Sequence, residues 1–234
     1  MTILSVAQDA AAKIGVPSPS ALVTSNDPDA KLIKTLIGTI CKELGRRHDW
    51  QELTREATFT TVATESQGTL ASIASDIDRI IPNTAWDRTQ NRPLGGPLTA
   101  KEWQQLKSSN VAGPYNDMRI IGKELKLIPA PAAGNTVAFE YITSNIGEDS
   151  GGTELSAFTA DTDVPLLDEY LLMLFVVWQY KRTKGIDYRE DFQIAEIEFA
   201  NRSASTSPRR TLDLGRSSRL TSGVDAPDGN WNIS

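Results

Sequence analysis

The segment from residue 76 to residue 106, DIDRIIPNTAWDRTQNRPLGGPLTAKEWQQL, cannot form one continuous helix. Each of its three prolines removes a backbone donor and blocks the preceding helical turn. The segment is also rich in tryptophan and arginine, which dominate binding hot spots at protein interfaces. The pattern predicts a shaped surface that binds another protein chain, although tryptophans in a β-rich region can equally be core residues. The predicted contact residues in this segment are Trp86, Arg88, Arg92 and Trp103.

Length, cysteine content and charge exclude several classes of protein. The 234 residues suffice for one large or two small domains, and a single cysteine, Cys41, excludes an internal disulfide framework. The longest apolar run, 171–178, has eight residues, whereas a membrane span needs about 20, so we expect no membrane partner. A net charge of −6 argues against general, phosphate-driven nucleic-acid binding. The amino-terminal sequence lacks signal-peptide features, so we expect synthesis in the cytoplasm.

Both ends of the chain show the apolar spacing of helices. The pattern predicts helices over 3–14 and 28–47, the second capped by Asn26 or Asp27. It also predicts a helical hairpin over 163–183 and 188–204, interrupted at Gly185. The run 171–178 is apolar all round its helix, so we expect burial on every side, with a neighbouring subunit covering one face. The residues predicted for packing, either in the core or between subunits, are Leu171, Leu172, Leu174, Phe175 and Trp178.

The middle of the chain changes to a period of two. Residues from Thr54 onward alternate β-branched or aromatic with polar side chains, and short strands are predicted over 118–121, 124–128 and 136–143. Gly122 and Lys123 fit a hairpin turn between the first two of these. Thr99 and Glu102 have the spacing of a capping box before a short helix.

The order of these elements predicts an α+β fold. We expect a helical bundle formed by the N- and C-terminal helix pairs, with an inserted β-rich domain and an extended C-terminal tail. The predicted boundaries are 1–52 and 161–207 for the two parts of the helical domain, 53–160 for the insertion and 208–234 for the tail.

The predicted tail is poor in apolar residues and cannot bury enough surface to fold alone. Its arginines are expected to pair with carboxylates on a partner, because the guanidinium binds a carboxylate through two parallel hydrogen bonds. Direct contact with DNA and a merely solvated tail are the alternatives. The predicted contact residues are Arg209, Arg210, Arg216, Arg219 and Trp231.

The segment 76–106 resembles head-to-tail adaptor (connector) proteins of tailed bacteriophages. Other parts agree in order along roughly residues 1–207, including GKELKLIP at 122–129, FEYI at 139–142 and WQYKRTKGIDY at 178–188. The resemblance implies a structural virion protein at the neck, assembled as a homo-oligomeric ring, usually of twelve subunits. The implied partners are the portal protein, tail or neck proteins, and double-stranded DNA that passes through the channel without specific binding. The resemblance implies no catalytic residue, cofactor or metal ligand.

Several residues invite a chemical interpretation. Residues 148–154, EDSGGTE, are superficially similar to the GDSGG of trypsin-like proteases, but a loop with a Gly-Gly hinge explains them better. The single histidine, His48, could be a general base, although its place at a predicted helix end favours an interaction with the helix dipole. Asp76 and Asp78 could form an acid–base pair or lie at an exposed strand end.

A carboxylate cluster could bind a divalent cation, but its spacing does not match an EF-hand, and helix capping explains it equally. The cluster consists of Asp161, Asp163, Asp168 and Glu169. The sequence thus favours a non-enzymatic ring adaptor without cofactors. The alternatives are another neck or tail-completion protein, a metal-dependent enzyme and a DNA-binding module.

Overall fold

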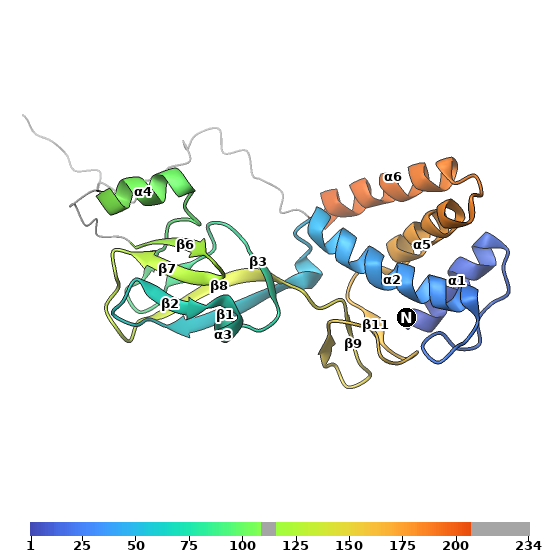
Figure 1. Ribbon diagram of the computed structural model, residues 1–234, viewed down its shortest axis with the longest axis horizontal. Helices are drawn as coiled ribbons and strands as arrows, with labels where there is room; N and C mark the ends of the chain where they lie inside the picture. Colours follow the sequence, from blue (N-terminus) through green and yellow to red (C-terminus); the bar gives the residue numbers. More distant parts are fainter. Residues whose placement is uncertain (109–115, 207–234) are drawn as a thin grey trace, which may run out of the picture.

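The computed structural model describes residues 1–108 and 116–206, and the fold is a mixture of helices and antiparallel sheets (Figure 1). The predicted α+β class is therefore confirmed. The chain has two separate hydrophobic cores, one mainly between helices and one mainly between strands, and we call the regions around them the helical lobe and the β lobe. Within the described residues, no helix is both long and apolar enough to cross a membrane. The predicted domain boundaries stay predictions, and the predicted tail lies outside the described residues.

The helical lobe contains α1 (Ile3–Ile14), α2 (Pro28–Arg47), α5 (Glu169–Lys184) and α6 (Arg189–Thr206). The predicted capping signals operate as expected. The side chain of Asp27 accepts a hydrogen bond from the backbone N–H of Ala30 and starts α2. Gly15 and Gly185 end α1 and α5 in the left-handed conformation, with φ of 85° and 72°.

Helix α5 lies at the centre of the helical lobe and contacts α1, α2 and α6. The single chain already buries all five residues predicted for core or inter-subunit packing, which places them in the core of the subunit. Their exposed fractions are 0% for Leu171, Leu172 and Phe175, 2% for Leu174 and 6% for Trp178.

The start of α5 also differs from the prediction. The helix begins at Glu169, with Asp168 as its N-cap, rather than near Asp163. Val164 and Pro165 instead form β11, which pairs with β9 (Gly147–Glu148). Proline can occupy either the first turn of a helix or a short edge strand, so this residue alone does not fix the boundary.

The β lobe is built around β8 (Thr136–Thr143). β8 pairs with β1 (Thr54–Thr60) along seven residue pairs, and with β3 (Ile77–Ile80) and β4 (Trp86–Asp87) on its other edge. A second sheet has the order β2 (Ser66–Thr69), β7 (Glu124–Ile128), β6 (Asp117–Ile121). Phe139, Leu125 and Leu127 are among the side chains that fill this core. The strands predicted over 118–121, 124–128 and 136–143 are confirmed to within one residue.

The segment 76–106 is divided into short elements, as its prolines require. It contains β3, β4, β5 (Arg92–Pro93) and α4 (Ala100–Ser108). The capping box is confirmed, since the Thr99 backbone N–H donates to Glu102 at 2.8 Å. Gly122 and Lys123 have φ of 59° and 69° and form the predicted turn between β6 and β7. The remaining elements are η1 (Gln51–Leu53), α3 (Leu70–Ile73) and β10 (Glu154–Leu155).

Two glycines give a paired test of this packing. A Cβ at Gly147 would lie 2.4 Å from Phe158 Cε1 and 2.8 Å from the Val164 carbonyl oxygen, whereas a Cβ at Gly38, inside α2, meets nothing within 4 Å. We therefore expect Gly147→Ala to lower the free energy of unfolding by about 1–3 kcal/mol through overpacking. Gly38→Ala should raise it by about 0.5–1 kcal/mol through helix propensity. Urea denaturation at low protein concentration measures both, and equal effects would contradict this description of the two sites.

Candidate interaction surfaces

Trp86 projects from a strand next to the edge of the larger sheet. It lies on β4, between β8 and the two-residue strand β5, and its side chain is 42% exposed. Its indole N–H donates to the Asn91 side-chain oxygen at 3.3 Å, which orients the ring along the β4–β5 turn. A large exposed aromatic ring held by its own turn is a suitable anchor for a protein partner.

A buried aspartate fixes this turn. Asp87 is 4% exposed, and its carboxylate accepts hydrogen bonds from the backbone N–H groups of Thr89 and Gln90, both at 2.9 Å. Its other oxygen accepts from the Asn135 side chain at 2.8 Å. The sequence analysis missed Asp87, although an aspartate two residues before a polar turn residue is the pattern of an Asx turn. Asp87 therefore determines how Trp86 is presented.

The other residues predicted to bind a partner have different positions. Arg88 donates to Glu56 at 2.6 Å and remains half exposed, and Arg92 is exposed on β5. Trp103 is only 2% exposed, with the ammonium of Lys107 5.9 Å from its ring centre. The prediction that Trp103 contacts a partner is therefore wrong, because its ring is buried within the chain. Arg209, Arg210, Arg216, Arg219 and Trp231 lie outside the described residues.

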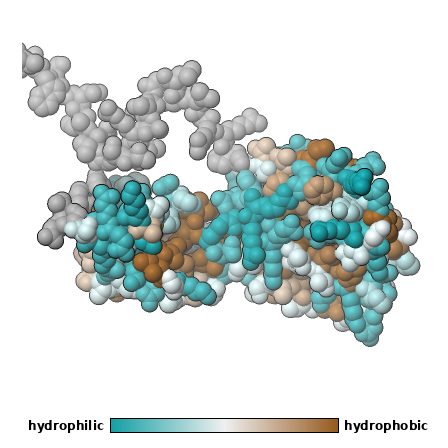
Figure 2. All heavy atoms as spheres, turned by 45° about the horizontal axis from the view of Figure 1, so that its top comes forward, coloured by the Kyte–Doolittle hydropathy of each residue, from teal (hydrophilic) through white to brown (hydrophobic). Residues whose placement is uncertain are grey.

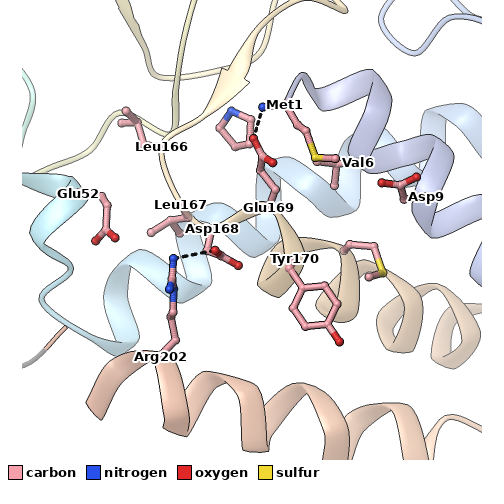
Figure 3. Close-up of a pocket in the computed structure, with 12 residues that line it drawn as sticks. Met1, Val6, Asp9, Glu52, Leu166, Leu167, Asp168, Glu169, Tyr170 and Arg202 are labelled. Carbon is pink, nitrogen blue, oxygen red and sulfur yellow. Dashed lines mark hydrogen bonds and ion pairs between the residues drawn. The ribbon is translucent and has the colours of Figure 1, made fainter. Parts of the chain in front are cut away.

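A charged pocket of about 460 Å³ lies where α1, α5 and α6 approach one another (Figure 3). Arg202, on α6, donates to Asp168 at 2.8 Å, and Figure 3 shows the two side chains pointing toward each other. The amino group of Met1 forms an ion pair with Glu169, at the first turn of α5. These contacts join the amino terminus and α6 to the start of α5. The two ion pairs therefore strengthen the packing around the pocket.

The carboxylates predicted as possible metal ligands accept hydrogen bonds from different parts of the chain. Asp161 accepts from the backbone N–H groups of Leu22 and Val23, at 3.0 and 2.7 Å. Asp163 is 1% exposed and accepts from those of Thr159 and Ala160, at 2.6 and 2.9 Å. No cluster of three or more ligand-type side chains suited to a metal ion occurs within residues 1–108 and 116–206.

His48 packs beside an aromatic ring. It follows α2, and its ring meets Trp50 edge-on, with 5.0 Å between the ring centres. Its Nε2 atom is buried and has no hydrogen-bond partner in the part of the chain that the structure describes. Residues 148–154 form a tight turn between β9 and β10, where Asp149 accepts from the backbone N–H groups of Gly151 and Thr153. Those hydrogen bonds hold the pKa of Asp149 below its usual value.

Asp76 and Asp78 do not form an acid–base pair. Asp76 accepts hydrogen bonds from the Tyr141 and Thr143 hydroxyls, at 3.0 and 2.7 Å, whereas Asp78 forms an ion pair with Arg79. Burial, together with the hydrogen bond to Asp76, raises the pKa of Tyr141 to about 12. Asp76 thus links β8 to the segment that precedes β3.

An elongated groove of about 970 Å³ follows the outer face of α2. Gly38 lies at its middle, and the loops before α2 and around β9 form its other wall. Its lining combines apolar side chains with lysines, arginines and one glutamate, Glu43. The lining includes Leu22, Val23, Ile146, Phe158, Lys34, Lys42 and Arg46.

Helix α6 exposes an apolar row away from the core. Glu190, Ile194, Ile197 and Asn201 recur at the spacing of one helix face, and all four are exposed. The isoleucines are 40% and 62% exposed. Figure 2 shows apolar atoms among polar ones on the upper part of the helical lobe, where α6 comes forward. The sequence analysis missed both this row and the groove on α2.

Comparison of the sequence with protein-family models and with curated proteins finds no match.

Asp163 offers a test of structural against metal-binding roles. We expect Asp163→Ala to lower the free energy of unfolding by about 1–3 kcal/mol, because two backbone donors lose their acceptor. Asp9→Ala, an exposed carboxylate in the charged pocket, should change it by less than about 0.5 kcal/mol. Thermal unfolding with and without Ca²⁺ or Mg²⁺ measures both variants. A stabilisation of the parent chain by either cation that disappears in Asp163→Ala would revive the metal hypothesis.

Tyr141 makes stability depend on pH in the alkaline range. Its ordinary pKa is about 10, so a raised folded-state pKa contributes stability below pH 10 that is lost as the pH rises from about 10 to 12. We expect an ultraviolet titration of the tyrosines to contain a component near pH 12, and Tyr141→Phe should remove that component. Its persistence in the variant would contradict the assignment.

Proposed function

We propose that this chain is a structural subunit of a phage head-to-tail adaptor. In this proposal, subunits form a ring that joins the portal vertex to the tail and lets DNA pass. The helices around α5 make the bundle that forms the ring body, the inserted β lobe presents contacts to neighbouring virion proteins, and the tail beyond residue 207 binds the portal.

The observation that carries this proposal is the exposed edge formed by Trp86 and its turn. This edge lies in the segment that resembles adaptors, and a buried carboxylate, Asp87, holds it in shape. An exposed aromatic ring that is fixed before binding loses little conformational entropy when a partner covers it. Such a surface favours recognition of another protein.

The uses of the carboxylates also support a non-enzymatic role. Asp76, Asp161 and Asp163 serve as hydrogen-bond acceptors within the fold, and Asp168 caps α5 and pairs with Arg202. A catalytic acid or base needs a free position near a substrate proton. These groups are instead committed to the packing of loops and helix ends.

Electron microscopy of the chain mixed with the portal ring of the same virion tests the proposal. We expect a second ring stacked on the portal, with occupancy that falls on truncation after Ser207. Trp86→Ala should weaken an association of the β lobe with its partner by roughly tenfold or more, as for an interface hot spot. Tyr170→Ala, which removes another exposed aromatic ring, is the matched control.

Each result has a defined meaning. A stacked ring whose occupancy falls on truncation supports the adaptor function and the role of the tail. A ring on a tail or neck protein but not on the portal would assign the chain to a position further from the head. Failure of the chain to associate with any of these rings would contradict the proposal.

A further inference from the structure

We infer that the apolar row on α6 of one copy docks into the α2 groove of the next copy. The inference deepens the proposed ring function, because it names the two surfaces through which the subunits associate. The row comprises Glu190, Ile194, Ile197 and Asn201, and the groove has Gly38 at its middle.

The two surfaces match in shape and hydrophobicity. The row presents two isoleucines on one face of a helix, which is the form that a helix takes when it binds in a groove. The groove is long and open, with apolar side chains in its lining and a volume of about 970 Å³. Neither surface is covered by the chain's own described residues. Burial of two exposed isoleucines in an apolar groove favours association.

The isolated subunit gives no structural reason for a glycine at position 38. It lies inside a helix of twenty residues, where glycine is destabilising relative to alanine, and it has a helical backbone that any residue can adopt. A Cβ there would meet nothing within 4 Å. Glycine is suited to a position where another backbone approaches closely. A helix from a second copy lying over Gly38 accounts for this residue.

The charges of the two surfaces are complementary. Lys34, Lys42 and Arg46 line the groove and form no ion pair within the described residues. Glu190 lies in the α6 row and Glu198 beside it, and neither forms an ion pair in the same part of the chain. Opposite charges around an apolar contact fix its register and disfavour wrong partners.

The positions of the surfaces suit a ring. In Figure 1, α6 and β9 lie on opposite sides of α2. Ile146, which directly precedes β9, lines the groove. A contact between two different surfaces of identical subunits is heterologous, and such contacts form a closed ring when the rotation between neighbours closes. A contact of one surface with itself would stop at a dimer.

Disulfide cross-linking of the full-length chain tests the docking. The native Cys41 is buried, and burial raises the pKa of its thiol to about 12, so it should not compete. We expect a mixture of the single variants Ile197→Cys and Thr39→Cys to form covalent heterodimers under conditions in which copies associate. The double variant should form a ladder of larger covalent oligomers. Thr39→Cys mixed with Val62→Cys, an exposed apolar position on the β lobe, is the control and should not cross-link.

Gly38→Leu separates docking from folding. The substitution adds bulk at the groove, and its Cβ meets nothing within 4 Å. Leucine also favours a helix more than glycine does, so the thermal unfolding midpoint of the dilute chain should stay the same or rise. The yield of cross-linked heterodimer should fall at least tenfold. An unchanged yield would overturn the inference, because a leucine at the contact would then have no effect.

Other outcomes would also overturn the docking. Homodimers of Ile197→Cys alone would indicate a contact of α6 with itself. DNA binding that weakens steeply with salt and is lost in Lys34→Glu with Lys42→Glu, while cross-linking is unchanged, would assign the groove to nucleic acid. Rings on the portal without the cross-link would overturn this interface and leave the adaptor proposal intact. Cross-linked oligomers with no affinity for the portal would support this interface and contradict the adaptor proposal.

Discussion

The burial of α5 is the constraint on which the rest of the helical lobe depends. This helix is apolar on every side over most of its length, so it is stable in water only when other elements enclose it. Helices α1 and α2 come from the start of the chain and α6 from its end. Their packing on α5 therefore brings distant parts of the sequence together. Arg47 strengthens this closure, because it pairs with Glu196 of α6 while its guanidinium lies 4.1 Å from the centre of the Phe199 ring.

Ionisable residues in this structure mainly organise the backbone. Aspartates accept hydrogen bonds from loop or helix N–H groups at several separate places, including Asp27, Asp87, Asp149 and Asp163. Buried or half-buried donors need such acceptors, because an unsatisfied backbone group away from water is costly. The acidic composition therefore reflects a fold with many short loops as well as an exposed charged surface.

The sequence predicted the elements whose local signals and packing agree. The cap at Asp27, the capping box at Thr99 and Glu102, and the turn at Gly122 and Lys123 are local signals that the fold keeps. Strand β8 was recognisable because its β-branched and aromatic residues fit a pleated, buried surface.

Other features depend on tertiary contacts that no local pattern contains. Trp86 and Trp103 lie in similar sequence surroundings, yet one is exposed and the other buried, because sheet edge and helix face decide their environments. The enclosure of α5 by its own chain could not be distinguished from enclosure by a second subunit. The exposure of the α6 row was not predicted from the sequence. Isoleucines at helical spacing are typical of a core face, and only the packing of α6 shows which face is buried.

Strand β8 connects the two cores through its alternation. Phe139 and Tyr141 pack into the β lobe, whereas Ile142, on the opposite face, packs into the helical lobe. The seven residue pairs between β1 and β8 run along the line that joins the lobes. Thr54 of β1 and Ile142 of β8 are paired at the end next to the helical lobe, so the chain crosses between the lobes twice, side by side. A force that separates the lobes would therefore be carried along two covalent strands in parallel and would not act across their hydrogen bonds. The connection between the lobes is thus built to resist extension.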